Sequence, residues 1–390
     1  MDRAKGCPFD PPPAARALQD RTPLARVRLA DGTTPWLVTR YAEQRALLAD
    51  PRLSSDAGNP GYPSGAPIPA GGSPISFILM DDPEHARLRR MVISAFTVKR
   101  VATMRPTVQR ITDELIDELL AGPKPVDLVD AFALPMPSLV ICALLGVPYR
   151  DHEFFQANSR VIIKRDVPPE ERMAGHRALL GYLDDLMADK LARPADDLLS
   201  GLASRVHAGE LTRSEAAQMG VLLLLAGHET TANMIALGTL ALLEHPEQLN
   251  LLRGNDDPGL VVSSVEELLR YLNITHNGRR RVALADIEIA GETIRAGEGV
   301  IMANDIGNRD TAQFTDPDRL DLTRDARHHV AFGFGVHQCL GQPLARLELQ
   351  VVYSTLYRRI PTLRLATELD AIPFKHDGAV YGVYELPVTW

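Results

Sequence analysis

Residues 332–341 read Phe-Gly-Phe-Gly-Val-His-Gln-Cys-Leu-Gly, a stretch that places one histidine and one cysteine among three glycines. A regular apolar pattern follows from Leu344 to Val352, and Pro343 fits the first turn of a helix there. We expect a tight loop that delivers Cys339 to this first turn. Unpaired N–H groups and the helix dipole there favour thiolate over thiol, and glycines let a flat ligand approach. The stretch therefore predicts that Cys339 binds, as a thiolate, the metal of a planar macrocycle. The simpler alternative is that Cys339 is a buried cysteine with a purely structural role.

Length and composition set the class of protein. The chain has 390 residues, 45% of them hydrophobic, and nothing that resembles a linker divides it, so we expect one domain over residues 1–390. The net charge of −8 argues against nucleic acid as a partner, which would need a basic patch. The three cysteines are far apart, which argues against a disulfide framework or a zinc site and suits a reducing cytoplasm.

No segment predicts a membrane anchor. The first thirteen residues are polar and rich in proline, and the longest apolar run, residues 221–226, is far too short to span a bilayer. We therefore expect a protein of the cytoplasm, and we expect it to be a monomer.

The N-terminal third mixes short strands, loops and helices. Residues 1–22 predict an extended lead-in, Asp31-Gly32 predicts a hairpin between apolar runs, and residues 41–48 predict a helix. Residues 57–75 hold five glycines and five prolines. Long ordered loops are often lids, so residues 57–80 predict a substrate-access loop, with a disordered surface loop as the equal alternative.

Helices dominate from Pro83 onward. His85 and Arg89 are four residues apart, so they share a helix face that could hold a carboxylate, although taken alone they are better explained by a solvated basic stripe that includes Arg87 and Arg90. Further helices are expected to about Leu120, over residues 136–145, and over residues 151–191 with a break at residues 167–169.

A long helix is predicted from the capping box Thr212-x-x-Glu215 to about Glu244. Its middle reads Ala226-Gly227-His228-Glu229-Thr230-Thr231. A mid-helix glycine is unfavourable, a buried carboxylate needs a partner, and a threonine can bond back to the carbonyl of Ala226. A glycine, a carboxylate and a threonine that are each unusual in the middle of a buried helix occur together here, which indicates a functional site. The alternative is a bend in a core helix whose polar groups are all hydrogen-bonded.

The C-terminal third adds strands. Residues 281–302 alternate apolar and polar around two glycine turns, and residues 362–366 and 380–388 are candidates for the last strands. Before the first of these strands, Glu267 and Arg270 are three residues apart and can form an ion pair on one helix face. Such a pair alone is weak evidence of a particular fold or function, because surface pairs of this kind are common.

Together these motifs resemble the cytochrome P450 family, particularly its soluble actinobacterial branch. Residues 332–341 match its haem-binding loop, residues 226–231 its oxygen-activation motif, and Glu267-x-x-Arg270 its buried ion pair. The resemblance implies a mainly α fold with a small β region around a buried haem. It also implies that Arg319, from Pro317-Asp318-Arg319-Leu320, joins the ion pair.

The resemblance implies specific roles around haem b. Cys339 would bind the iron and push electron density toward it, which favours O–O cleavage. Glu229 and Thr230 would relay protons to bound O₂. The remaining cofactor-binding residues would be His85, Arg89, Ala226, Gly227, Arg281, Phe332, Gly335, His337 and Gly341. Of these, His85, Arg89, Arg281 and His337 would hold the propionates, with Arg279 and Arg280 leaving the register of Arg281 open.

The implied reaction is insertion of one oxygen atom from O₂ into a C–H bond of a sizeable hydrophobic molecule, such as a macrolide, a steroid-like compound or a xenobiotic. Electrons would come from a separate ferredoxin and its reductase. A basic docking patch would then involve Lys99, Arg100, Arg105 and Arg346, unless these form an ordinary solvated face. The substrate would contact Phe77, Ile78, Leu222, Leu225, Ala226 and Ile274.

The sequence is also compatible with other functions. The same fold could run peroxide-driven or oxidative coupling chemistry, although the intact Glu229–Thr230 pair favours O₂. It could also be a non-catalytic haem sensor or carrier, which needs no proton route. A helical protein without a cofactor would leave residues 332–341 unexplained.

Overall fold

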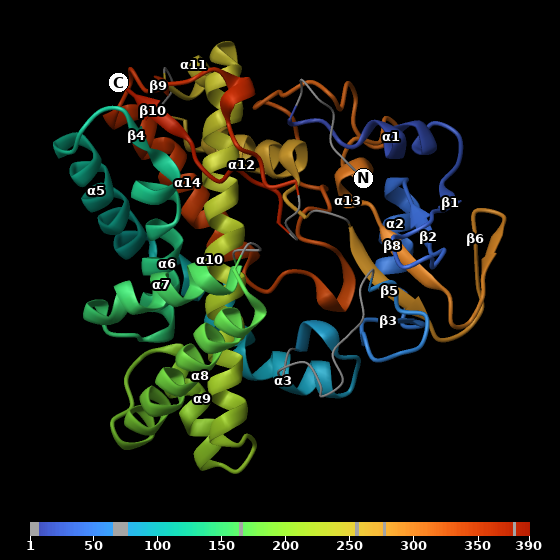
Figure 1. Ribbon diagram of the computed structural model, residues 1–390, viewed down its shortest axis with the longest axis horizontal. Helices are drawn as coiled ribbons and strands as arrows, with labels where there is room; N and C mark the ends of the chain where they lie inside the picture. The colour runs from blue at the N-terminus through green and yellow to red at the C-terminus, as the bar shows by residue number, and fades with distance from the viewer. Residues whose placement is uncertain (1–7, 65–76, 164–166, 254–256, 276–277, 377–379) are drawn as a thin grey trace.

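The computed structural model describes residues 8–64, 77–163, 167–253, 257–275, 278–376 and 380–390. Most helices lie on one side of the long helix α10, together with the small sheet of β4, β9 and β10, and the larger sheet lies on the other side with α1, α2 and α13 (Figure 1). The helices are α1 (Pro13–Gln19), α2 (Tyr41–Leu48), α3 (Glu84–Val92), α4 (Val98–Ala102), α5 (Arg105–Ala121), α6 (Pro135–Leu145), α7 (His152–Ile163), α8 (Pro169–Ala192), α9 (Leu198–His207), α10 (Arg213–Glu244), α11 (Pro246–Arg253), α12 (Pro258–Leu272), α13 (Asn304–Gly307) and α14 (Gln342–Arg359). The mainly α fold with a small β region is confirmed.

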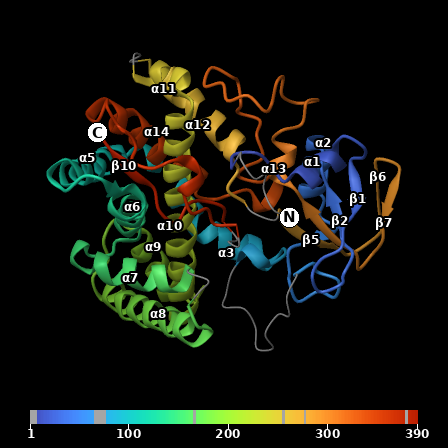
Figure 2. The same ribbon diagram turned by 45° about the horizontal axis from the view of Figure 1, so that its top comes forward.

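Helix α10 is the axis of the helical side. Its N-terminus has the predicted capping box, in which Thr212 accepts from the N–H of Glu215 and Glu215 accepts from the N–H of Thr212. By length and composition α10 is apolar enough to cross a membrane, but 72% of its apolar window is buried inside the molecule. Helices α6, α8, α9 and α14 pack around it, as both views show (Figure 2). Its hydrophobicity is therefore that of a core helix.

The strands form one mixed sheet and two small ones. The five-stranded sheet has the order β1-β2-β8-β5-β3, in which only the β2–β8 pair is parallel. The strands are β1 (Leu24–Arg26), β2 (Trp36–Val38), β3 (Leu53–Ser54), β5 (Arg279–Ala283) and β8 (Gly299–Met302). The predicted hairpin around Asp31-Gly32 is present. Strand β5 begins two residues earlier than predicted and carries Arg279, Arg280 and Arg281.

The other two sheets are small. Strand β10 (Pro387–Thr389) pairs with both β4 (Val126–Asp127) and β9 (Arg364–Leu365), while β6 (Ile287–Ile289) pairs with β7 (Glu292–Ile294). Just before β10, a side chain at Gly382 would come within 1.6 Å of Asn233 on α10. The C-terminal segment therefore lies directly against α10.

Two loop predictions have partial outcomes. Half of the expected access loop, residues 65–76, lies outside the described residues, and the end of the loop forms a 3-10 turn, η1 (Phe77–Leu79). The break predicted at residues 167–169 separates α7 from α8, which begins at Pro169.

Candidate active site

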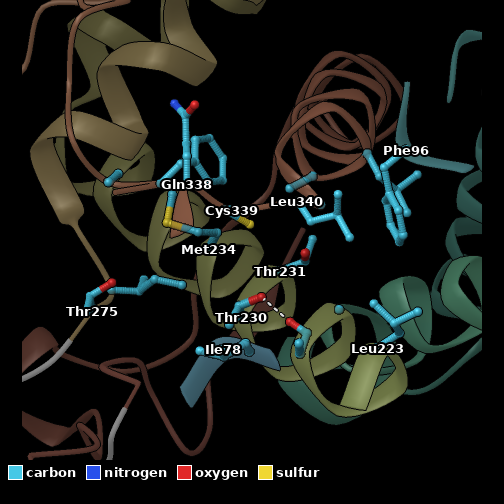
Figure 3. Close-up of a pocket in the computed structure, with 18 of the residues that line it drawn as sticks. Ile78, Phe96, Leu223, Thr230, Thr231, Met234, Thr275, Gln338, Cys339 and Leu340 are labelled. Carbon is cyan, nitrogen blue, oxygen red and sulfur yellow. Dashed lines mark hydrogen bonds between the residues drawn. The ribbon is translucent and has the colours of Figure 1, made fainter. Parts of the chain in front are cut away.

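A cavity of about 300 Å³ lies between α10 and the loop that carries Cys339 (Figure 3). Most of its wall is apolar. It is lined by Phe77, Ile78, Arg89, Phe96, Ile141, Leu222, Leu223, Ala226, Gly227, Thr230, Thr231, Met234, Leu269, Ile274, Thr275, Arg279, Ala331, Phe332, His337, Gln338, Cys339, Leu340, Gly341, Leu344, Ala345, Glu348 and Leu349. The volume is at the lower end of the range typical of small-molecule sites.

The loop of residues 332–341 presents Cys339 to this cavity. The N–H of Cys339 donates to the carbonyl of Phe332 at 2.8 Å, which closes the loop. Cys339 precedes the first residue of α14 by three positions, so its placement within the helix was wrong. Burial raises the pKa of the Cys339 thiol, opposed by Arg279, the N–H of Gly341 and Arg89. In the protein alone, desolvation therefore outweighs the groups that favour thiolate.

The two glycines at the loop ends differ in what they permit. Gly341 lines the cavity and a side chain there would meet nothing within 4 Å, so a flat ligand can lie against it. Gly335 does not line the cavity. It has φ +73°, and a side chain there would come within 2.3 Å of the carbonyl of Leu48 on α2. Its expected contact with a cofactor is therefore replaced by close packing on α2.

Substituting Gly335 with alanine should destabilise the protein by about 1–3 kcal/mol, because the residue is strained and also collides with α2. The matched control is Gly291→Ala, which has φ +81° but open space around it and should cost only the backbone strain. Urea denaturation of the two variants measures the difference. Equal losses would show that contact with Leu48 is unimportant.

The middle of α10 forms the wall opposite Cys339. The hydroxyl of Thr230 donates to the carbonyl of Ala226 at 2.8 Å, as expected from the sequence (Figure 3). A side chain at Gly227 would meet Ile141 of α6 at 3.2 Å, so this glycine lets α6 approach closely. Leu225 was expected in the wall but is absent from it, because two residues turn a helix by roughly 200° from Leu223, which does line the cavity.

Glu229 is buried beside the cavity and does not line it. Its Oε1 atom accepts a hydrogen bond from Asn233 at 2.8 Å and from Lys375 Nζ at 2.8 Å. Lys375 comes from the C-terminal segment, 146 residues further along the chain. No local pattern in the sequence could have identified this partner, although the cost of a buried carboxylate indicates that one must exist.

Cationic and histidine side chains gather at one edge of the cavity. The rings of His85 and His337 lie 4.0 Å apart, and His85 Nδ1 is 3.0 Å from Asp82. Arg89 donates to the carbonyl of Gln338 at 2.6 Å. Burial, together with the positive charge of Arg281, lowers the pKa of His337 to about 3. His337 is therefore neutral at pH 7 unless an anion joins the cluster.

The alternation of strand β5 places Arg279 and Arg281 on one face and Arg280 on the other. Arg279 lines the cavity, whereas Arg281, the expected propionate ligand, lies close to Tyr62, Arg279 and Asp81 and does not line it. The side chain of Arg280 donates to the carbonyl of Ser64. The strand thus brings Arg279 nearest to the cavity, a position that the sequence left open.

The buried ion pair below the loop is present with a different third member. Glu267 and Arg270 are fully buried and pair at 2.7 Å. The third side chain is Arg324, whose Nε donates to Glu267 at 3.1 Å. The expectation for Arg319 was wrong: its side chain is 68% exposed and lies 3.5 Å from Asp321. Only the carbonyl of Arg319 takes part, as an acceptor for Arg324.

Two of the four residues expected in the docking patch are paired with acids. Arg346 donates to Glu266 at 2.6 and 2.9 Å, and its guanidinium lies 4.6 Å from the ring centre of Phe332. It therefore supports the loop of Cys339 instead of offering a free charge. Arg100 pairs with Asp196, which leaves Lys99 and Arg105 as the exposed candidates.

These residues fit a haem. Cys339 faces the cavity from one side, the bonded Thr230 faces it from the other, and open space at Gly341 accommodates a flat ring. At the cationic edge, His85 Nε2 and Arg279 Nε are buried without a partner among the described residues, as expected where anionic carboxylates would bind. Apart from Leu225, Gly335 and the side chain of Arg319, the predicted residues lie at this cavity, at its edge or in the network supporting it.

Comparison with known proteins gives the same result. A family model described as Cytochrome P450 matches residues 259–361. The chain is 57% identical over 395 residues to Cytochrome P450 GfsF of Streptomyces halstedii, covering 100% of this chain and 95% of that protein. The crystal structure of GfsF matches with a TM-score of 0.94 and 56% identity, covering 100% of this chain and 99% of the other.

A solved structure with a bound ligand is also similar. It is mycinamicin VIII C21 methyl hydroxylase MycCI from Micromonospora griseorubida bound to mycinamicin VIII, with 43% identity, a TM-score of 0.89, and coverage of 100% of this chain and 99% of that one. Fold and site thus define a haem-dependent monooxygenase. The chain belongs to the cytochrome P450 family, and the predicted resemblance is confirmed.

Proposed function

We propose that this monooxygenase hydroxylates a large lactone of the macrolide type in the cytoplasm, using electrons from a separate ferredoxin and reductase. The supporting observation is the largely apolar cavity between Cys339 and α10. An apolar wall with few polar groups binds hydrophobic ligands and fixes their orientation through those few groups. Mycinamicin VIII, the ligand of MycCI, is the model compound for the test.

The haem, held by Cys339 and the cationic edge, supplies the activation of O₂. The chain supplies position and protons. Apolar residues such as Leu223 and Ile274 hold the substrate and exclude water, and the hydroxyl of Thr230 lies in the opposite wall to donate a proton. Both bonds to Glu229 use Oε1, so Oε2 is the atom through which this acid would exchange protons with water.

The function is tested with the purified holoenzyme, a surrogate ferredoxin and reductase, and mycinamicin VIII under ¹⁸O₂. The expected product carries one labelled oxygen atom and forms only when electrons are supplied. A steroid and vitamin D₃ serve as comparison substrates of similar hydrophobicity. Product formed from hydrogen peroxide alone, without label from O₂, would contradict the electron-driven reaction. Turnover of the steroid but not of the lactone would contradict the substrate class.

Replacing Thr230 with alanine should uncouple the consumption of electrons from the formation of hydroxylated product. Product formation should fall by about 10²-fold, the lower end of what proton transfer contributes, while electron consumption continues. The measurement is product formed per NADPH consumed. Thr230→Ser keeps the hydroxyl and should retain most of the yield. An unchanged yield in the alanine variant would contradict a role for Thr230 in proton supply.

A further inference from the structure

Glu229 is held in place by a residue from the far end of the chain. Lys375 Nζ donates to Glu229 Oε1 at 2.8 Å, and the two side chains are only 13% and 10% exposed. Asn233, one turn further along α10, donates to the same oxygen at 2.8 Å. A carboxylate in so sheltered a place needs such partners, because removing the cation leaves its charge uncompensated. The position of Glu229 therefore depends on the segment that carries Lys375.

That segment belongs to two short stretches, residues 373–376 and 380–384, which we call the C-terminal arms. An antiparallel bridge joins the arms, and the N–H of Lys375 donates to the carbonyl of Gly382 at 2.8 Å. A side chain at Gly382 would come within 1.6 Å of the Oδ1 atom of Asn233, so the arms lie directly against α10 at this point. The arms supply one partner of the acid and pack against the other.

The second arm also supports the wall of the cavity. Ile274 and Thr275 line the cavity, and Figure 3 shows Thr275 in this wall. The carbonyl of Ile274 accepts a hydrogen bond from the N–H of Tyr381 at 2.8 Å, and Thr275 forms an antiparallel bridge with Val380. A substrate that packs against Ile274 and Thr275 is therefore backed by the same arms that carry Lys375.

We propose that Lys375 is a positioning residue through which the fit of the substrate controls the proton supply. A substrate that packs well against Thr275 constrains the C-terminal arms, so Lys375 keeps Oε1 of Glu229 fixed and leaves Oε2 to exchange protons with water. With a poorly fitting substrate the arms are less constrained. More O₂ then takes up two electrons and two protons and leaves as hydrogen peroxide, without oxidising the substrate. The inference rests on the proton-supplying role of Glu229 proposed above and adds its connection to the substrate.

The first test compares two lysines that form equally sheltered ion pairs. Lys190 pairs with Asp197, their side chains are 12% and 8% exposed, and neither lines the cavity. Lys190→Met and Lys375→Met should therefore lose similar stability. With mycinamicin VIII, only Lys375→Met should lower the product formed per NADPH, by about tenfold, as when a partner that orients a functional group is removed. The share of electrons recovered as hydrogen peroxide should rise in the same variant, and it is measurable even with a compound that yields no product.

Two further measurements separate positioning from a structural role. In D₂O, product formation by Lys375→Met should slow more than that of the wild type, because proton delivery then limits the reaction. Lys190→Met should show the wild-type isotope effect. Lys375→Arg keeps a cation that can donate to Glu229 and should restore most of the yield. Lys375→Gln, which keeps a donor without the charge, is the second variant if Lys375→Met does not fold, and its yield should also fall.

A double-mutant cycle tests the connection to the substrate. Thr275→Ala should lower the product per NADPH in the wild type and have no further effect in Lys375→Met, since the two residues act through one path. Additive effects would overturn the proposal, as would a wild-type yield in Lys375→Met or an equal loss in Lys190→Met. If Glu229→Gln lowers the yield while Lys375→Met does not, this inference alone fails. If neither variant lowers it, the proton-supplying role of Glu229 fails as well.

Discussion

Replacing Cys339 with histidine should abolish the strongly red-shifted absorption band that carbon monoxide produces in the reduced protein. That band reports a thiolate ligand, and Cys339 is the cysteine that faces the cavity. Monooxygenase turnover should fall by more than about 10²-fold, since loss of a residue that merely orients a ligand already costs up to that amount. Thiolate ligation also supplies the electron density that favours O–O cleavage.

The matched control for this experiment is Cys142→Ala. Cys142 is buried in α6 and does not line the cavity, so this variant should keep the spectrum and most of the activity. Spectra are recorded for both variants with equal haem content. A red-shifted band that persists in Cys339→His would place the iron ligand elsewhere in the chain. A band lost in Cys142→Ala would show that the spectrum reports general integrity instead of ligation.

The largest stability effect is expected from Arg270→Ala. This arginine is fully buried, pairs with Glu267, and donates to the carbonyls of Asn308 at 2.9 Å and Pro317 at 2.8 Å. Breaking a buried ion pair costs about 3–5 kcal/mol; here Glu267 would keep Arg324 as its charged partner, and the two carbonyls would lose their donor. The measurement is the free energy of unfolding of the holoenzyme in urea, followed by circular dichroism.

Two further arginines test which residue completes this network. Arg324→Ala removes a side chain that is 13% exposed and should cost about 1–3 kcal/mol, because Glu267 loses a charged donor. Arg319→Ala removes an exposed side chain and should change stability by no more than about 0.5 kcal/mol. These two variants remain informative if Arg270→Ala does not fold. Equal costs for them would contradict the assignment of Arg324.

Features with local signals were predicted from the sequence. The capping box fixed the start of α10, the back-bonded Thr230 followed from its spacing to Ala226, and the glycine loop identified Cys339. Each depends on residues within a few positions of one another. Such short-range geometry is determined by helix and turn stereochemistry, which the sequence displays directly.

Features that depend on distant contacts were missed or misplaced. Arg319 and Arg324 are five residues apart, and Arg324 follows Glu267 by 57 residues, so only packing decides which of the two side chains turns inward. Lys375 reaches Glu229 across 146 residues. The helix end beside Cys339 can be recognised in the sequence, whereas the burial that raises the pKa of its thiol depends on the folded structure. A sequence shows which groups need partners, but not which distant residues supply them.

The contact between Lys375 and Glu229 bears on the order in which the fold is completed. The two residues are 146 positions apart, so their pairing closes a long loop, and contacts of this kind form slowly because loop-closure entropy opposes them. Strand β10, which joins β4 and β9, makes further long-range contacts from the same part of the chain. Docking of this segment onto α10 is therefore a late step of folding, and it is the step that completes the surroundings of Glu229.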